Sequence, residues 1–81
     1  MDTKIKQDIS LGNNIRNLRI KSQLTQKEVA ARLQLLDIDI SRDFYAHIEN
    51  GTYNIRVSEL IALKKIFNAN YNDFFEGLEI E

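Results

Sequence analysis

Residues 24–35 read LTQKEVAARLQL, and this stretch decides how the chain folds. Thr25 is followed three positions later by Glu28. This is the spacing of a capping box, in which the hydroxyl and the carboxylate each accept a hydrogen bond from an otherwise unpaired backbone N–H. Apolar residues then recur at helical spacing, at Val29, Ala30 and Leu33. The stretch therefore predicts a helix that begins after Thr25 and buries one face.

The flanking segments show the same helical spacing of apolar residues. Upstream, Ser10 is a good N-cap residue, and the helix predicted after it has an apolar face formed by Leu11, Ile15 and Leu18. Downstream, Ser41 caps a third helix that ends at Asn50, where Gly51 suits a left-handed C-terminal turn. The inward residues of that third helix are Tyr45 and Ile48.

Two further helices complete the pattern. One is predicted over residues 57–67, and a short fifth helix, capped by Asn70 and Asp73, carries Tyr71, Phe74 and Phe75. Residues 36–40 alternate apolar and acidic side chains, as a strand would, but five residues without a partner strand cannot form a sheet. We interpret them as a connector, so the predicted fold class is all-α.

The composition fits one small globular domain of 81 residues, 43% of them hydrophobic, without Cys or Pro. The absence of Cys excludes disulfides, thiolate metal sites and cysteine nucleophiles. The chain also lacks the apolar run of about 18 residues that marks a membrane span. We expect a cytoplasmic protein with an N-terminal arm over residues 1–10, one domain over 11–76 and a C-terminal tail over 77–81.

Charge is distributed unevenly along the chain. Residues 1–35 carry seven Lys and Arg against three acidic residues, whereas residues 36–81 carry four against nine, and the net charge is −1. Phosphate groups respond to the local surface more than to the total charge, so the basic first half is compatible with a nucleic-acid partner. A mixed, soluble surface explains the same distribution.

In order and spacing, several segments together resemble the Cro/cI-type, or XRE-like, helix-turn-helix family. The segments are residues 15–19, 24–30, 48–51, 60–63 and 70–75. The resemblance implies a compact five-helix, lambda-repressor-like DNA-binding domain over residues 11–76, in which the second and third helices form the DNA-binding pair. The family's link between those helices is a tight turn. The extra residues Leu36 to Ile40 point to a subset with a lengthened turn, and they leave open the angle at which the third helix meets DNA.

The resemblance also implies which residues read DNA bases, because the first residues of the family's third helix face the major groove. These are Arg42, Asp43, Phe44 and His47. Arg42 can contact guanine, Asp43 can accept from cytosine, Phe44 can touch a thymine methyl, and His47 can donate to guanine N7 or to a phosphate. Other roles stay open: a phosphate contact for Arg42, helix-dipole stabilisation for Asp43, a core position for Phe44 and a plain surface site for His47.

By the same resemblance, other residues hold the DNA backbone. Gln26 lies where the family binds a phosphate at the start of the second helix, with Lys27 beside it, and the loop after the third helix supplies Asn50, Gly51, Thr52 and Arg56. Gln26 and Lys27 also fit ordinary surface positions at a helix start. Arg19 and Glu49 correspond to a partly buried structural ion pair that joins the first helix to the third.

These observations support a sequence-specific double-stranded DNA-binding protein, a repressor-like transcription regulator that binds its operator as a homodimer. The alternative is a protein-interaction module on the same fold, which the acidic residues near the third helix favour: Asp37, Asp39 and Asp43. Enzyme activity is not expected, because one His, no Cys and no glycine-rich phosphate loop leave no nucleophile–base pair. We likewise expect no metal, cofactor, membrane or small-molecule ligand.

Overall fold

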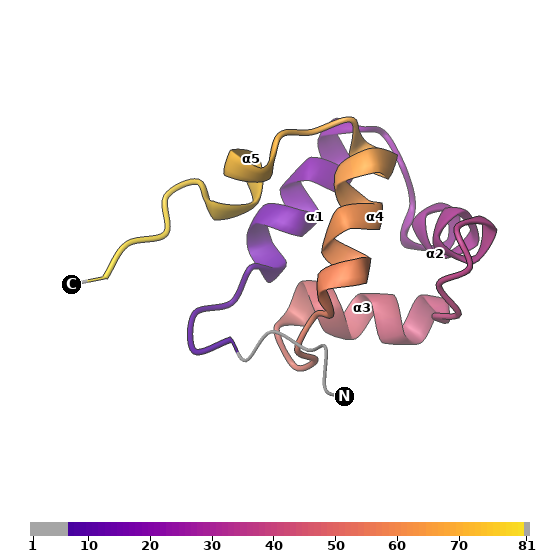
Figure 1. The fold of residues 1–81 in the computed structure, drawn as a ribbon, viewed down its shortest axis with the longest axis horizontal. Coiled ribbons are helices and arrows are strands. Elements are labelled where there is room, and N and C mark those ends of the chain that lie inside the picture. The colour runs from indigo at the N-terminus through magenta and orange to yellow at the C-terminus, as the bar shows by residue number, and fades with distance from the viewer. Residues whose placement is uncertain (1–6, 81) are drawn as a thin grey trace.

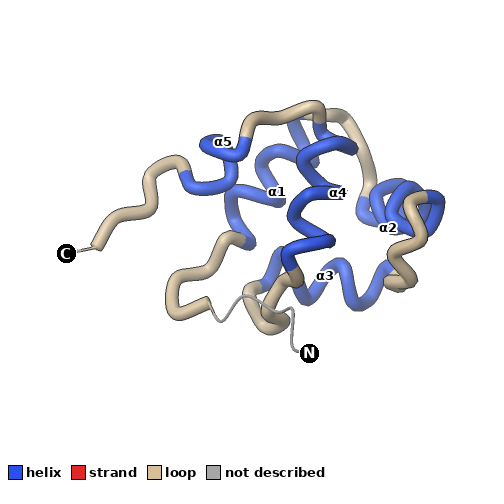
Figure 2. Tube along the Cα trace, in the orientation of Figure 1, coloured by secondary structure: helices blue, strands red, loops and turns tan. Residues whose placement is uncertain are grey.

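The computed structural model describes residues 7–80, and all of its ordered elements there are helices (Figures 1 and 2). There are five: α1 (Gly12–Lys21), α2 (Gln26–Leu35), α3 (Arg42–Asn50), α4 (Val57–Phe67) and α5 (Tyr71–Phe75). The predicted all-α, five-helix fold is therefore confirmed. Residues 1–6 of the predicted arm, including the apolar Ile5, lie outside the described residues.

The N-termini of α2 and α3 are capped as the sequence predicts. The Glu28 amide donates to Thr25 Oγ1 at 3.1 Å, and the Thr25 amide donates to Glu28 Oε1 at 3.0 Å. Ser41 Oγ accepts from the Phe44 amide at 3.2 Å. At α1 the cap differs from the prediction: Leu11 takes the N-cap position without a side-chain hydrogen bond, and Ser10, one residue earlier, accepts from the Gly12 amide through Oγ.

One apolar core is shared by all five helices. Each helix has eleven residues or fewer, too short to be stable alone, so the shared core holds them in place. The predicted inner faces of α2 and α3 are confirmed, and Phe74 secures α5 in the same way. The largest fully buried side chains are Tyr45, Phe74, Ile15, Leu33, Ile55, Leu63 and Val29.

The connector between α2 and α3 is irregular backbone whose side chains still alternate. Ile40 is buried in the core, and Leu36 and Ile38 pack against it half-buried, whereas Asp37 and Asp39 are exposed. Asp37 takes a left-handed conformation with φ of 62°, which turns the chain away from α2. The interpretation as a connector is therefore confirmed, and its apolar residues are anchored while its carboxylates face solvent.

Helix α1 meets the end of α3 at Gly12, a close approach that the sequence did not reveal. A Cβ atom on Gly12 would overlap the main-chain carbonyl of Glu49 and lie 2.9 Å from that of Ile48. Gly51, which ends α3, has the predicted left-handed backbone, with φ of 77°. The junction between the two helices therefore depends on glycine on both sides.

Both terminal segments are tied to the domain. Gln7 Oε1 accepts from the Leu11 amide at 3.0 Å, and the Gln7 amide donates to Asn54 Oδ1 at 3.3 Å. Asn14 on α1 donates through its amide nitrogen to the carbonyls of Phe74 at 2.9 Å and Glu76 at 3.0 Å, which fastens α5. Beyond α5 the chain leads away from α2 and α3 (Figure 1).

Candidate nucleic-acid interface

The four residues expected to read bases all lie on the outer surface of α3: Arg42, Asp43, Phe44 and His47. Helix α3 lies along one edge of the molecule, next to α2 (Figure 1). Phe44 is 55% exposed, so it is not a core residue, and Tyr45 and Ile48 occupy the inward face instead. Phe44 is therefore accessible to a partner from outside the protein.

Arg42 and Asp43 face each other at the start of α3. Arg42 Nη1 lies 3.4 Å from Asp43 Oδ1, and both side chains are largely exposed. An exposed pair at this distance is worth little, because solvent screens it and both side chains lose rotamer freedom. Either group is therefore available to another partner at small cost.

His47 is held from the loop that follows α3. Its Nδ1 atom lies 2.9 Å from the Thr52 hydroxyl, and its ring meets the Phe44 ring at 6.4 Å between centroids, edge to face. The backbone of Thr52 also caps the helix, because its amide donates to the His47 carbonyl at 3.1 Å. The side chain and main chain of Thr52 thus both contact His47.

Tyr53 is a residue of this surface that the sequence analysis missed. Its half-buried ring packs against the core and meets Phe44 at 6.0 Å between centroids, with an interplanar angle of 70°. The sequence signal was an aromatic residue in the loop directly behind the predicted reading helix. It was overlooked because only the folded loop brings residue 53 back toward residue 44.

The residues expected at the DNA backbone border α3 on two sides. Lys27 is exposed in the first turn of α2, and Asn50 is exposed in the last turn of α3. Arg56 is exposed as the N-cap of α4, where its amide donates to Glu59 Oε1 at 2.7 Å. The amides of Gly51 and Thr52 donate to α3 carbonyls, so they serve as helix caps.

A buried ion pair lies directly behind this surface. Arg19 Nε donates to Glu49 Oε2 at 2.7 Å and Nη2 donates to Oε1 at 3.2 Å, and Arg19 Nη1 donates to the Leu24 carbonyl at 3.0 Å. The two side chains are only 14% and 2% exposed. Two parallel bonds between guanidinium and carboxylate fix both distance and orientation, so the pair locks α1 to α3.

Gln26 extends this pair to the start of α2. Its Nε2 atom donates to Glu49 Oε1 at 3.1 Å. A side-chain amide nitrogen carries two hydrogens, so one remains for a second acceptor. Gln26 therefore joins the buried carboxylate to the outer end of α2, a link that its sequence position did not predict.

The environment of Glu49 favours its ionised form. Burial alone would raise the pKa of Glu49, but hydrogen bonds from Arg19 and Gln26 and the positive charge of Arg19 lower that pKa below its ordinary value. Tyr45 lies beside the pair, and burial raises the pKa of its hydroxyl, which therefore stays neutral.

Within residues 7–80, no three His, Asp or Glu side chains gather as a metal-binding cluster would. None of the described helices has the length and apolar character needed to cross a membrane.

Known proteins place this arrangement in a family. A family model described as "Helix-turn-helix domain" matches residues 12–80, which is nearly the whole described chain. The chain is also similar to Control protein C.MunI of Mycoplasma sp, with 31% identity over 74 residues that cover 90% of this chain and 93% of that protein. The match spans every helix of the fold and the loops between them. The chain belongs to the Cro/cI-type, or XRE-like, helix-turn-helix family of DNA-binding transcription regulators.

Proposed function

We propose that the chain is a sequence-specific, repressor-like transcription regulator that binds double-stranded DNA with α3 in the major groove. The observation that carries the proposal is that the inner and outer faces of α3 differ in burial. Its inner face is fixed by Tyr45, Ile48 and the Glu49 ion pair, while its outer face presents charged and aromatic side chains to solvent. A rigid helix with exposed polar groups is what base readout requires. The relative C.MunI is a control protein, which supports a regulatory role.

In this proposal the outer face of α3 reads bases by their exposed edges. Arg42 donates two hydrogen bonds to guanine O6 and N7, and Asp43 accepts from cytosine N4. Phe44 contacts a thymine methyl, and His47 donates to a purine. Because the Arg42–Asp43 pair is weak and exposed, it opens readily when each group meets its base.

Phosphate contacts flank this helix in the proposal. Gln26 donates its second amide hydrogen and Lys27 adds positive charge at the start of α2, where unpaired backbone amides attract an anion. On the other side, Asn50 and Arg56 supply side-chain donors, and Gly51 and Thr52 lie against the DNA backbone. Such contacts set the orientation of the protein and carry no sequence information of their own.

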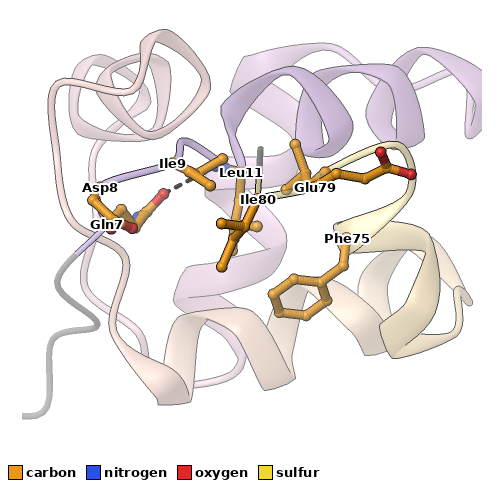
Figure 3. A pocket seen from close by; sticks show the side chains of 8 residues that line it. Gln7, Asp8, Ile9, Leu11, Phe75, Glu79 and Ile80 are labelled. Atoms are coloured by element: carbon orange, nitrogen blue, oxygen red, sulfur yellow. Dashed lines mark hydrogen bonds between the residues drawn. The ribbon is translucent and has the colours of Figure 1, made fainter.

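We also propose that the chain binds its operator as a homodimer through the face opposite α2. Three apolar side chains are exposed there, Ile9 at 41%, Phe75 at 49% and Ile80 at 93%. They line a groove of about 270 Å³ between the segment before α1 and the C-terminal tail (Figure 3). A two-fold axis at this face would let each patch cover the other. The two α3 helices would then enter grooves about 34 Å apart.

Selection of bound sequences from a random double-stranded DNA pool tests the regulator. Enrichment of a motif made of two related half-sites is expected. Failure to enrich any sequence at low salt would contradict the proposal and favour the protein-interaction alternative, for which the exposed Asp37 and Asp39 are the candidate surface.

Sedimentation equilibrium tests the dimer. A Phe75→Glu, Ile80→Glu variant should be monomeric at concentrations at which the unsubstituted chain is dimeric. If the unsubstituted chain is itself monomeric at high micromolar concentration, the dimer face is wrong.

A further inference from the structure

Four side chains from α3 and the loop after it form one continuous row on the candidate interface. Thr52 contacts His47, His47 contacts Phe44, and Phe44 contacts Tyr53. We propose that Thr52 and Tyr53 are positioning residues that fix His47 and Phe44 for base readout, and that Thr52 makes His47 a hydrogen-bond donor toward a purine N7. This inference rests on the proposed DNA-binding function. It explains how His47 and Phe44 would distinguish between bases.

The contact between Thr52 and His47 decides which ring nitrogen faces outward. Nδ1 is engaged by the Thr52 hydroxyl at 2.9 Å, so Nε2 is the ring nitrogen left for a ligand. His47 is exposed, which lets that nitrogen reach a partner outside the protein. The ring is therefore presented by one edge, and a base would meet Nε2.

The direction of that hydrogen bond decides what Nε2 can recognise. The Thr52 hydroxyl has two acceptors within reach, His47 Nδ1 at 2.9 Å and the His47 carbonyl at 3.4 Å. The carbonyl already accepts from the Thr52 amide at 3.1 Å, and the amide of Gly51 is also directed at it. The shorter contact, to the less occupied acceptor, is the better hydrogen bond. The hydroxyl then donates to Nδ1, and the neutral ring carries its proton on Nε2.

A donating Nε2 seeks an acceptor at a base edge. In the major groove, guanine presents N7 and O6 as acceptors, and adenine presents N7. The opposite tautomer would instead favour the amino groups of adenine or cytosine. Thr52 thus selects between two classes of base without contacting a base itself.

The second half of the row restrains Phe44. Its exposed ring is met edge to face by His47, at 67°, and by Tyr53, at 70°. Tyr53 is half-buried against the core, so it is the fixed end of the row. Edge-to-face contacts are favourable for aromatic rings, and they reduce the ordering that Phe44 must undergo when it meets a thymine methyl.

Ring mobility in the free protein tests the positioning role of Thr52. His47 is the one histidine in the sequence, so its imidazole signals are assigned without ambiguity. Carbon-13 relaxation should show a more mobile ring in Thr52→Val, which keeps the side-chain shape but lacks the hydroxyl. Thr52→Ser, which keeps the hydroxyl, should match the unsubstituted chain. Equal ring mobility in all three proteins, or a neutral His47 protonated on Nδ1, overturns the inference.

DNA with a modified base tests the specificity. At the purine whose selection depends on His47, replacing guanine by 7-deazaguanine or adenine by 7-deazaadenine removes the N7 acceptor. The unsubstituted chain and Thr52→Ser should lose about 3- to 10-fold in affinity, the effect of one hydrogen bond. Thr52→Val should bind both DNAs nearly alike. Equal sensitivity of Thr52→Val and the unsubstituted chain overturns the inference.

Uracil in place of thymine tests Tyr53 by removing the methyl that Phe44 contacts. Sensitivity to this change should persist in Tyr53→Phe, which keeps the ring, and fall in Tyr53→Leu, whose fold is verified by thermal unfolding. Equal sensitivity in both folded variants contradicts the role of Tyr53. If the unsubstituted chain prefers no DNA sequence, the proposed function fails and the reading role fails with it. The ring-mobility result stands apart, because it is measured without DNA.

Discussion

Arg19 and Glu49 are joined by two parallel hydrogen bonds, of 2.7 and 3.2 Å, that connect the first helix of the domain to the third. The bonds come from adjacent nitrogens of one guanidinium and end on the two oxygens of one carboxylate. Glu49 is on the inner side of the same helix whose outer side carries the candidate base-reading residues. The orientation of that outer side is therefore tied to the pair.

Loss of Arg19 should destabilise the fold strongly. Arg19→Met keeps an apolar stem but leaves the Glu49 carboxylate, 2% exposed, without its charged partner. Breaking a buried pair on one side costs about 3 kcal/mol or more in the free energy of unfolding, measured by urea denaturation. Arg16→Met, at an exposed position of the same helix, is the matched control and should leave that free energy nearly unchanged. Equal effects of the two substitutions would show that the pair contributes no stability.

The same pair should make stability depend on pH on the acid side. The pKa of Glu49 is lower in the folded chain than in the unfolded chain, so near pH 4 the unfolded state binds more protons. The stabilisation is complete above the ordinary glutamate value of about 4.3, and it is lost as pH falls through the lowered value. Unfolding free energies measured from pH 7 to 3 should fall less steeply in Glu49→Gln. An exposed control, Glu79→Gln, should retain the slope, and an unchanged slope in Glu49→Gln would contradict this assignment.

Gly12 should not tolerate even one added methyl group. In an exposed helix position, replacing glycine by alanine would stabilise by about 0.5–1 kcal/mol. Here the new Cβ would overlap the Glu49 carbonyl, a backbone atom that cannot rotate away. The steric clash should outweigh the gain in helix propensity, so Gly12→Ala should lower the free energy of unfolding by about 2 kcal/mol. Asn13→Ala, one residue further on the exposed side of α1, should be neutral or stabilising, and a stable Gly12→Ala would refute the close approach.

The sequence was sufficient to predict the features that depend on residues close together in the chain. The capping box of Thr25 and Glu28 is local, since both groups lie within one helical turn, and the structure contains it. The inner faces of the helices follow from spacing alone. The connector before Ser41 was also interpreted correctly, since its alternating side chains simply point inward and outward without a partner strand.

What could not be predicted depends on how the helices pack together. The overlap at Gly12 arises because α1 and α3 approach each other over a separation of nearly forty positions, and no pattern near Gly12 encodes that distance. The bond from Gln26 to Glu49 and the contact of Tyr53 with Phe44 have the same origin. Each contact depends on how two separate elements are placed in the fold. Helix propensity and the spacing of apolar residues therefore cannot predict it.

Substitutions at two exposed arginines should distinguish base contacts from phosphate contacts: Arg42, the first residue of α3, and Arg56, the N-cap of α4. Arg42→Gln should weaken binding mainly to the preferred DNA and relax selection at one base position, because a bidentate guanine contact contributes about 1–3 kcal/mol of discrimination. Arg56→Gln should weaken binding to all sequences alike. It should also reduce the slope of log affinity against log salt by about one, since one fewer counterion is released. Binding titrations at several salt concentrations, on preferred and scrambled DNA, distinguish the two. Identical profiles for both variants would mean that Arg42 also meets only phosphate, and base selection would then rest on Asp43, Phe44 and His47.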